Sequence, residues 1–388
     1  MPSKVFYEKG KKYNCTKNGK PYYRMTVTIA GKRHEVYGDG EKDAKAKAEE
    51  LKTQSAMGYD LAKKNAKVGS VINYWLFNVK RVDKNLKASS FARYECAVRN
   101  HIMPYPIATA TLSQLDSATM QAYVTSLYED HGLSGPNIAS VVKVWRLFCK
   151  WAQEEGYIIK NPCRNLSLPG AREKGKKKIV TFSAEERATL LSYMRDSKYC
   201  YDTVIELAFA TGMRQGELLG LRWEDVDLLA RTITVSRSTA VVVHINKEGT
   251  RDRYREVWDT KTENSNRVIP LLPSTAKMLE THRVKQRDYF ESIGKPQPEY
   301  VFTTETGALI DQTSFGKSYT RLLRRANIPH RKFHAIRHTF ATEAIRKGVD
   351  VKDLAMLLGH SDVSTTYIYV QPNEETKRNA IEKMGQIM

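Results

Sequence analysis

The second half of the sequence carries arginine and histidine residues in short motifs that suit chemistry on a phosphate. Arg214 follows a Thr-Gly turn in ATGMRQGELLGLRWEDVD, and Glu217 lies three residues further on, where it can brace that turn. In FHAIRHTFATEAIRKG, His334 and Arg337 are three residues apart and share one face of a predicted helix. Guanidinium groups stay protonated and offer paired donors to phosphate oxygens. Together these residues predict a site that holds a phosphate.

Two further motifs supply candidates for proton transfer and nucleophilic attack. Lys261 lies before the turn-prone ENSN stretch, in a predicted strand pair formed by residues 233–244 and 260–271. LLGHSDVSTTYIYVQ places His360 nine residues before Tyr369. A tyrosine hydroxyl has a reference pKa of about 10, so it needs a base or a strongly positive surrounding to attack phosphorus. Taken singly, each motif also fits a structural role, as an Arg–Glu pair, an exposed lysine or a partly buried histidine.

In this order and with these flanking residues, the motifs resemble the catalytic domain of the tyrosine recombinase and integrase family, over about residues 182–371. The resemblance implies that Tyr369, rather than the nearby Tyr367, attacks the DNA phosphate and forms a 3′-phosphotyrosyl link. It implies that Lys261 protonates the departing 5′-hydroxyl and that His334 is a candidate acceptor of the tyrosine proton. The implied catalytic set is Arg214, Lys261, His334, Arg337, His360 and Tyr369, supported by Glu217.

We expect this chemistry to need no cofactor and no metal. In the family, one phosphoester bond is exchanged for another, so neither ATP nor a ligase is required. The sequence has no P-loop motif and no acidic cluster typical of a two-metal nuclease. Its five cysteines are far apart, with no C-x-x-C pair, which indicates a reducing cytoplasm and no structural zinc.

The composition of the chain favours a polyanionic partner. The 388 residues carry a formal charge of +20, from 63 Lys and Arg against 43 Asp and Glu. Nucleic acid is the commonest such partner, although charge alone also fits a basic enzyme of another kind. The opening residues contain no apolar leader, and no later run approaches the ~20 apolar residues that span a bilayer. We therefore expect a cytoplasmic protein with no membrane partner.

Residues 1–66 are expected to form a small sheet with one helix. Nine lysines and arginines precede residue 34, against the single acid Glu8, so non-specific attraction to phosphate is expected. Alternation over residues 21–38 around Gly31 predicts a hairpin, and the composition of 41–54 predicts a helix. The pattern resembles the arm-binding module of phage and conjugative-transposon integrases, in which a three-stranded sheet enters the major groove. A generic small β domain fits the pattern equally well.

Residues 67–168 are expected to form an all-α domain. Turn residues at Pro104, Pro106, Gly132, Gly135 and Pro136 separate its predicted helices, 69–80, 89–102, 113–130 and 137–156. Trp145, Phe148 and Trp151 fall on one helix face, which we interpret as core. The closing phrase WAQEEGYIIKNPC resembles the end of the core-binding domain, which clamps DNA opposite the catalytic domain in the same family.

The remaining residues divide into a linker and a third domain. Residues 169–180 predict a basic linker, and Ser183 with Glu186 forms a capping-box pattern at the start of the domain at 181–388. The expected fold is therefore multidomain: a small β-sheet plus helix, an all-α domain, and a mainly α (α+β) catalytic domain with a C-terminal helical tail. The tail has an apolar stripe that docks either on its own domain or on a neighbouring protomer, formed by Ile381, Met384 and Ile387.

These inferences lead to a site-specific integrase of a mobile element, from a phage or a conjugative transposon. By resemblance it binds core and arm attachment sites on double-stranded DNA and works as a homo-tetramer through a Holliday junction. An excisionase and a host DNA-bending protein are further expected partners, and a bacterial, nucleoid-associated location follows. Two alternatives remain: a type IB topoisomerase-like nicking and closing enzyme, and a DNA-bridging protein without turnover.

Overall fold

The computed structural model of the chain describes residues 5–17, 19–29, 31–63, 65–169, 179–197, 201–259, 266–370 and 382. The chain divides into two compact units. Unit 1 holds residues 1–176 together with 245–250, and unit 2 holds residues 177–244 and 251–388. In the ranges described, no helix is both long enough and apolar enough to cross a membrane. The two units are described separately below.

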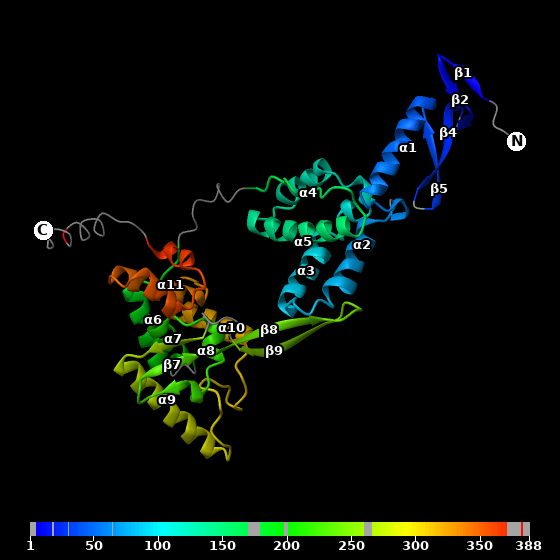
Figure 1. Cartoon of the computed structure of the whole chain (residues 1–388). Helices are drawn as coiled ribbons and strands as arrows, with labels where there is room; N and C mark the ends of the chain where they lie inside the picture. The colour runs from blue at the N-terminus through cyan, green and yellow to red at the C-terminus, as the bar shows by residue number, and fades with distance from the viewer. Residues whose placement is uncertain are drawn as a thin grey trace. The chain divides into compact units, whose positions relative to one another are not determined.

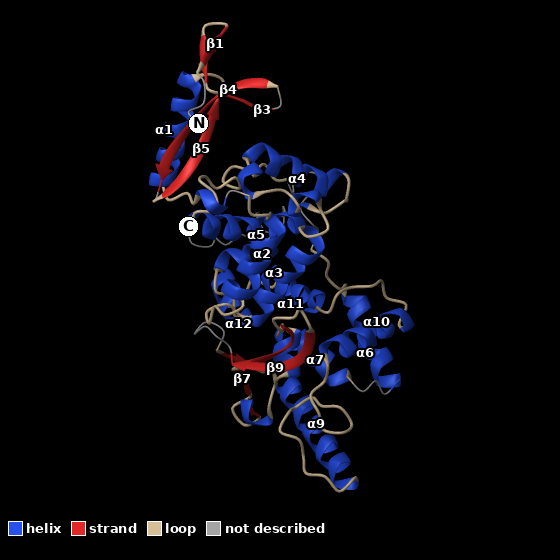
Figure 2. Ribbon diagram, turned by 90° about the vertical axis from the view of Figure 1, so that its right-hand side faces the viewer, coloured by secondary structure: helices blue, strands red, loops and turns tan. Residues whose placement is uncertain are grey.

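Unit 1 begins with short antiparallel strands and one covering helix. The three-stranded sheet has the order β3-β4-β5, and α1 lies along β4 and β5 in both views (Figures 1 and 2). Gly31 directly precedes the return strand of the hairpin at a φ of +76°, a conformation that glycine adopts without steric strain. The predicted hairpin and helix are confirmed, with the bounds β1 Phe6–Glu8, β2 Lys11–Tyr13, β3 Cys15–Lys17, β4 Lys20–Ile29, β5 Lys32–Gly38 and α1 Glu41–Ala56.

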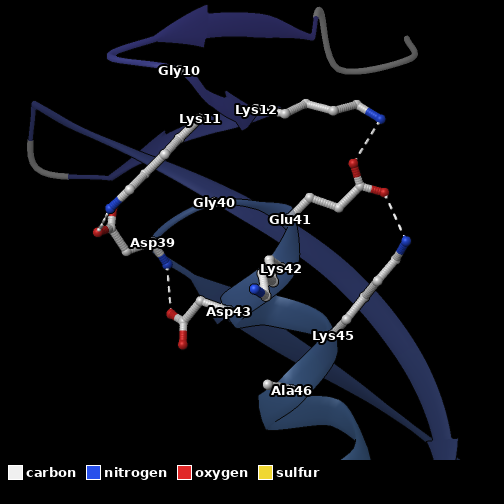
Figure 3. A pocket seen from close by; sticks show the side chains of 10 residues that line it. All are labelled: Gly10, Lys11, Lys12, Asp39, Gly40, Glu41, Lys42, Asp43, Lys45 and Ala46. Carbon is white, nitrogen blue, oxygen red and sulfur yellow. Dashed lines mark hydrogen bonds and ion pairs between the residues drawn. The ribbon is translucent and has the colours of Figure 1, made fainter.

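The lysines of β2 are paired with carboxylates around the start of α1. They line a hollow of about 1010 Å³ together with the first turn of the helix (Figure 3). Lys11 pairs with Asp39, while Glu41 accepts from both Lys12 and Lys45 at 3.0 Å (Figure 3). Part of the basic excess in the N-terminal residues is therefore offset locally, and surface pairs of this kind contribute little to stability.

The rest of unit 1 is helical, as predicted. One departure concerns Gly135 and Pro136, which we expected in a turn but which form the first residues of α5. The reason is that proline is well tolerated in the first helical turn, where its missing N–H has no helical partner. The helices are α2 Val68–Tyr74, continued by a π-helical turn at Trp75–Lys80, then α3 Ala88–His101, α4 Ser117–Glu129 and α5 Gly135–Glu154.

The aromatic face of α5 forms the centre of this helical core. Trp145 and Phe148 are fully buried, and their rings meet edge to face with centroids 5.9 Å apart. Trp151 is half-buried and continues the row against Phe148. The burial of Trp145 and Phe148 confirms the interpretation of this face as core. Such aromatic pairs stabilise a core through their buried area and their edge-to-face contact.

Unit 2 combines helices with short strands, and its first helix begins at the predicted capping box. Ser183 N donates to Glu186 Oε2 at 2.9 Å, and Glu186 N donates to Ser183 Oγ at 3.1 Å. The helices are α6 Ala184–Ser197, α7 Asp202–Thr211, α8 Gln215–Leu219, α9 Pro273–Ser292, α10 Gln312–Arg325, α11 His334–Arg346 and α12 Val351–Leu358. Single 3₁₀ turns include Val363–Thr365 (η8) and Tyr367–Tyr369 (η9).

The strands of unit 2 correct one prediction in part. The strands are β6 Val226–Asp227, β7 Thr232–Val235, β8 Arg237–Ile245, β9 Arg251–Asp259 and β10 Arg267–Pro270. β7 pairs with β10 as predicted, but β8 pairs with β9 in a separate long hairpin (Figure 1). A local turn explains the change of partner: Asn246 N donates to Thr250 O at 3.1 Å, and Gly249 supplies a φ of +83°. Nearby residues close a hairpin at a smaller entropic cost than distant ones.

Candidate active site

Two left-handed glycines end the helices that surround the candidate site. Gly212 ends α7 at a φ of +65°, and Gly359 ends α12 at a φ of +66°. A Cβ on Gly359 would lie 2.8 Å from Arg267 Nη1, and one on Gly212 would lie 2.6 Å from the Phe340 ring. Both positions therefore require glycine for conformation and for space. At these helix ends, the backbone carbonyls of Gly212, Leu358 and Gly359 accept hydrogen bonds from arginine side chains.

Arg337 is the most deeply buried of these arginines, with 2% of its surface exposed. It lies in the first turn of α11, and its guanidinium donates to Gly212 O at 3.0 Å and to Leu358 O at 2.7 Å. Burial and the nearby charge of Arg214 lower the pKa of Arg337 to about 9. The group consequently remains protonated at neutral pH and is fixed in position by two backbone carbonyls.

Arg214 and Glu217 make the contact predicted from their spacing. Arg214 is the N-cap of α8, and its backbone N–H donates to Glu217 Oε2 at 2.9 Å. Its guanidinium donates to Glu217 Oε1 at 2.8 Å and to Gly359 O at 3.1 Å. The carboxylate thus braces the turn while leaving the arginine partly exposed.

Arg267 is a third arginine of the site, and the sequence reasoning missed it. It lies on β10, 50 residues from Glu217, and its Nη2 and Nη1 donate to the two carboxylate oxygens at 2.8 and 3.2 Å. Burial opposes ionisation of Glu217, but the bonds and charges of Arg267 and Arg214 outweigh it and lower the pKa of the carboxyl below its ordinary value. The sequence did contain one indication of Arg267: it is two residues from the buried Ile269 and so lies on the same inward face of the strand, where a charged side chain needs a partner.

The two predicted histidines are neutral neighbours of these arginines. Partial burial of the ring, followed by the charges around it, lowers the pKa of His334 to about 4, and the same causes lower that of His360 to about 4. His360 follows the Gly359 cap, and its Nδ1 lies 2.7 Å from Thr366 Oγ1. Neutral imidazoles can donate or accept a hydrogen bond without adding charge to a site that is already cationic.

Tyr369 is buried in unit 2, with 4% of its surface exposed, whereas Tyr367 is 58% exposed. The Tyr369 ring packs with Ala341, Leu354 and Leu358. Burial raises the pKa of its hydroxyl, while the charges of Arg337 and Arg214 act in the opposite direction. The charges of both predicted arginines therefore act on this hydroxyl.

His338 is the hydrogen-bond partner of Tyr369, and the sequence reasoning missed it as well. Its Nδ1 lies 2.8 Å from the Tyr369 hydroxyl. It follows Arg337 directly and lies one helical turn beyond His334, with the two histidine rings edge to face at 4.7 Å. That spacing was visible in the sequence, but an i,i+4 histidine pair on a helix is not by itself a functional signal.

The structure thus brings six of the seven predicted residues into one site in unit 2. These are Arg214, Glu217, His334, Arg337, His360 and Tyr369. Lys261 lies outside the described residues, as do Ile381, Met384 and Ile387 of the tail. In the described part of the site, two guanidinium groups bind the carboxylate of Glu217 and the guanidinium of Arg337 adds a third positive charge, so the site is cationic and suits an anion.

Comparisons of sequence place this site among known proteins. The pattern of the phage integrase family matches residues 181–376. A tyrosine recombinase XerC-like protein of Caldanaerobacter subterraneus subsp. tengcongensis is 37% identical over 398 residues, covering 97% of this chain and 99% of the relative. The tyrosine recombinase XerC of Bacillus pumilus is 27% identical over 305 residues, covering 77% of this chain and 90% of the relative.

Solved structures share the fold. The integrase of transposon Tn1549, in complex with transposon right-end DNA, has a TM-score of 0.67 at 19% identity, covering 82% of this chain and 99% of that one. A lambda integrase tetramer bound to a Holliday junction has a TM-score of 0.57 at 15% identity and covers 95% of both chains. At these identities the likeness concerns architecture, and it agrees with the expected combination of a small sheet, a helical part and a mainly α part.

Proposed function

The chain belongs to the phage integrase family of tyrosine recombinases, and on that premise we propose that it integrates and excises a mobile element at specific attachment sites. The observation that carries the proposal is the position of the Tyr369 hydroxyl. It lies within the field of Arg214 and Arg337, whose guanidinium groups are held by backbone carbonyls. A nucleophile beside fixed cationic donors suits in-line attack on a phosphodiester.

The proposed roles follow from the charge that develops in the reaction. Attack on phosphorus spreads negative charge over the non-bridging oxygens, which the guanidinium groups of Arg214 and Arg337 would bind. His334 and His360, being neutral at pH 7, would add hydrogen bonds to the same phosphate. The Tyr369 oxygen forms the bond to phosphorus, the bond to the 5′-oxygen breaks, and Lys261 supplies the proton that this oxygen takes up.

The domain roles extend this proposal to the rest of the chain. We assign residues 1–66 to arm-site binding and 67–168 to core-site binding, with 169–180 as linker and 181–388 as the catalytic part. The three-stranded sheet of unit 1 supports the first assignment. Solved relatives bound to a core site, to a Holliday junction and to transposon-end DNA support double-stranded DNA as the partner and a homo-tetramer as the working assembly.

The test is formation of a covalent adduct on DNA. We would incubate the protein with a pool of nicked duplexes that carry randomised cores, without ATP, and recover protein–DNA adducts under denaturing conditions. The sequences recovered define the preferred core, and duplexes with that core then serve as substrate. We expect a 3′-linked adduct that the Tyr369→Phe variant does not form. An adduct of undiminished yield from that variant would refute the assignment.

A second readout separates recombination from related activities. Paired duplexes with the selected core should give Holliday junctions and exchanged strands. Relaxation of supercoiled DNA without strand exchange would instead support the topoisomerase-like alternative. DNA binding without any adduct would support the bridging protein.

A further inference from the structure

We infer that His338 is the residue that accepts the proton of Tyr369 during cleavage and returns it during religation. The inference rests on the proposed role of Tyr369 as nucleophile and adds a residue to the proposed set. Its basis is the 2.8 Å contact between His338 Nδ1 and the Tyr369 hydroxyl. That distance lies within the reach required of a general base, so proton transfer needs no rearrangement of either side chain.

The fold fixes this contact from both sides. His338 lies within α11, whose neighbouring residues pack in the core of unit 2, and Tyr369 is held in the cluster of Ala341, Leu354 and Leu358. The edge of the His334 ring restrains the His338 ring at a centroid distance of 4.7 Å. For Nδ1 to accept from the phenol, the ring proton must lie on Nε2, and a neutral histidine provides that tautomer.

His338 is better placed for this role than His334, to which the family resemblance pointed. In the described part of the chain, the Tyr369 hydroxyl is hydrogen-bonded to His338 and not to His334. His334 is the first residue of α11 and retains access to solvent, where it can meet a phosphate. The geometry therefore divides the two roles: His334 faces the phosphate, and His338 faces the nucleophile.

The charges around His338 keep it able to accept a proton. The titratable and charged groups that meet it are Tyr369 from η9 and His334 and Arg337 from α11. Burial, followed by the charge of Arg337, lowers the pKa of His338 below its ordinary value, so the ring is neutral at pH 7. A phosphate bound to the arginines would offset their charge and stabilise the imidazolium once it forms.

Atoms and charges balance in the proposed step. The phenolic proton moves to His338 Nδ1 while the Tyr369 oxygen bonds to phosphorus and the bond from phosphorus to the 5′-oxygen breaks. The 5′-oxygen takes a proton from its own donor, assigned above to Lys261. In religation the 5′-hydroxyl gives its proton back to Lys261 as its oxygen attacks phosphorus, the bond from phosphorus to the Tyr369 oxygen breaks, and the imidazolium returns its proton to that oxygen. Nothing is oxidised or reduced.

The test measures the single-turnover rate of adduct formation on the selected nicked duplex from pH 5.5 to 9.5. The key variant is His338→Asn, because the asparagine oxygen can still accept from the phenol but cannot carry its proton away. We expect a rate about 10²–10⁴-fold lower at pH 7, the usual contribution of a general base, with part of it regained as rising pH ionises the phenol. Tyr367→Phe is the matched control, expected to keep the wild-type rate because that side chain is exposed.

A second variant keeps the test decisive if asparagine disturbs the fold. His338→Ala leaves space beside the tyrosine, and added imidazole should restore much of the rate, which a misfolded protein would not allow. A His338→Asn variant within about threefold of the wild-type rate across the pH range would overturn the inference, as would failure of imidazole to rescue a folded His338→Ala variant. An absent adduct in the wild type would instead count against the proposed function itself.

Discussion

Replacing Glu217 by glutamine should strongly destabilise unit 2. The carboxylate accepts both terminal nitrogens of Arg267 and one from Arg214, and the side chains of Glu217 and Arg267 are only 3% and 6% exposed. Glutamine keeps the shape but removes the charge and turns one acceptor into a donor that faces guanidinium N–H groups. Breaking a buried ion pair by removing one partner costs about 3–5 kcal/mol, because the remaining charge stays buried.

Hydrogen–deuterium exchange followed by mass spectrometry can measure this loss within unit 2 alone. Peptides that cover α8 and β10 should exchange faster by roughly 150- to 5,000-fold, which corresponds to about 3–5 kcal/mol in the opening equilibrium. The exposed pair of Arg346 and Glu343 offers a matched control, and Glu343→Gln should change the free energy by less than about 1 kcal/mol. If Glu217→Gln lowered the free energy of unfolding by less than ~1 kcal/mol, the buried pair of Glu217 and Arg267 would not be the brace that its burial indicates.

The pH dependence gives a second check of the same reasoning. The pKa of Glu217 is below its ordinary value, so its stabilisation is present above the pKa of the unfolded chain, about 4.3. It is lost as the pH falls through the lower folded value. The wild type should therefore lose stability in acid from this group, whereas Glu217→Gln should lack that part of the loss. Identical acid profiles would contradict the assignment of the pair.

Three further predictions follow from single contacts. Gly359→Ala should abolish adduct formation and cost about 1–2 kcal/mol or more in thermal unfolding, because a Cβ meets Arg267 at 2.8 Å and the backbone is left-handed. The pKa of His360 is about 4 in the folded protein and about 6.5 in the unfolded chain, so the unfolded chain binds a proton at a higher pH than the folded protein does. The stability of unit 2 should therefore fall as the pH drops from about 6.5 towards 4. His360→Asn should flatten this dependence in pH-dependent denaturation. Asp116→Ala removes the cap on Thr119 N and should cost about 0.5–2 kcal/mol, measured by thermal melting of the helical part.

The features that the sequence predicted well are those set by neighbouring residues. The capping box at Ser183, the hairpin around Gly31 and the Arg214–Glu217 contact depend on residues within a few positions of one another. Side-chain spacing, turn conformation and helix period determine such features directly. For the same reason, a separation of three residues was enough to predict that His334 and Arg337 lie on one helix.

The features that the sequence did not reveal depend on distant partners. Arg267 is hydrogen-bonded to Glu217, which is 50 residues away in the sequence, and His338 to Tyr369, which is 31 residues away. Neither contact leaves a periodic signal, because only the packing of β10 and α11 against other elements brings the partners together. The β8–β9 hairpin was missed for a related reason. From the sequence, the residues after β7 could pair either with the segment that forms β9 or with the segment that forms β10.

The structure also supplies a physical reason to distinguish the two tyrosines that spacing alone left to family resemblance. Both lie in the single 3₁₀ turn η9, where residues two apart point in different directions because each residue advances about a third of a turn. Only one of them can face α11, and it is Tyr369, which is buried against His338.

The two arginines whose charges act on that hydroxyl are already held in place by the protein. The guanidinium of Arg337 uses two of its five N–H donors on Gly212 O and Leu358 O, and that of Arg214 is bound to Glu217 and Gly359 O. The remaining donors of both groups can therefore turn to a phosphate without reorganising the site. Donors fixed before the substrate arrives are those that stabilise a developing charge most effectively. The glycine caps, the buried carboxylate and the histidine on Tyr369 thus support the site that we propose for the phosphate.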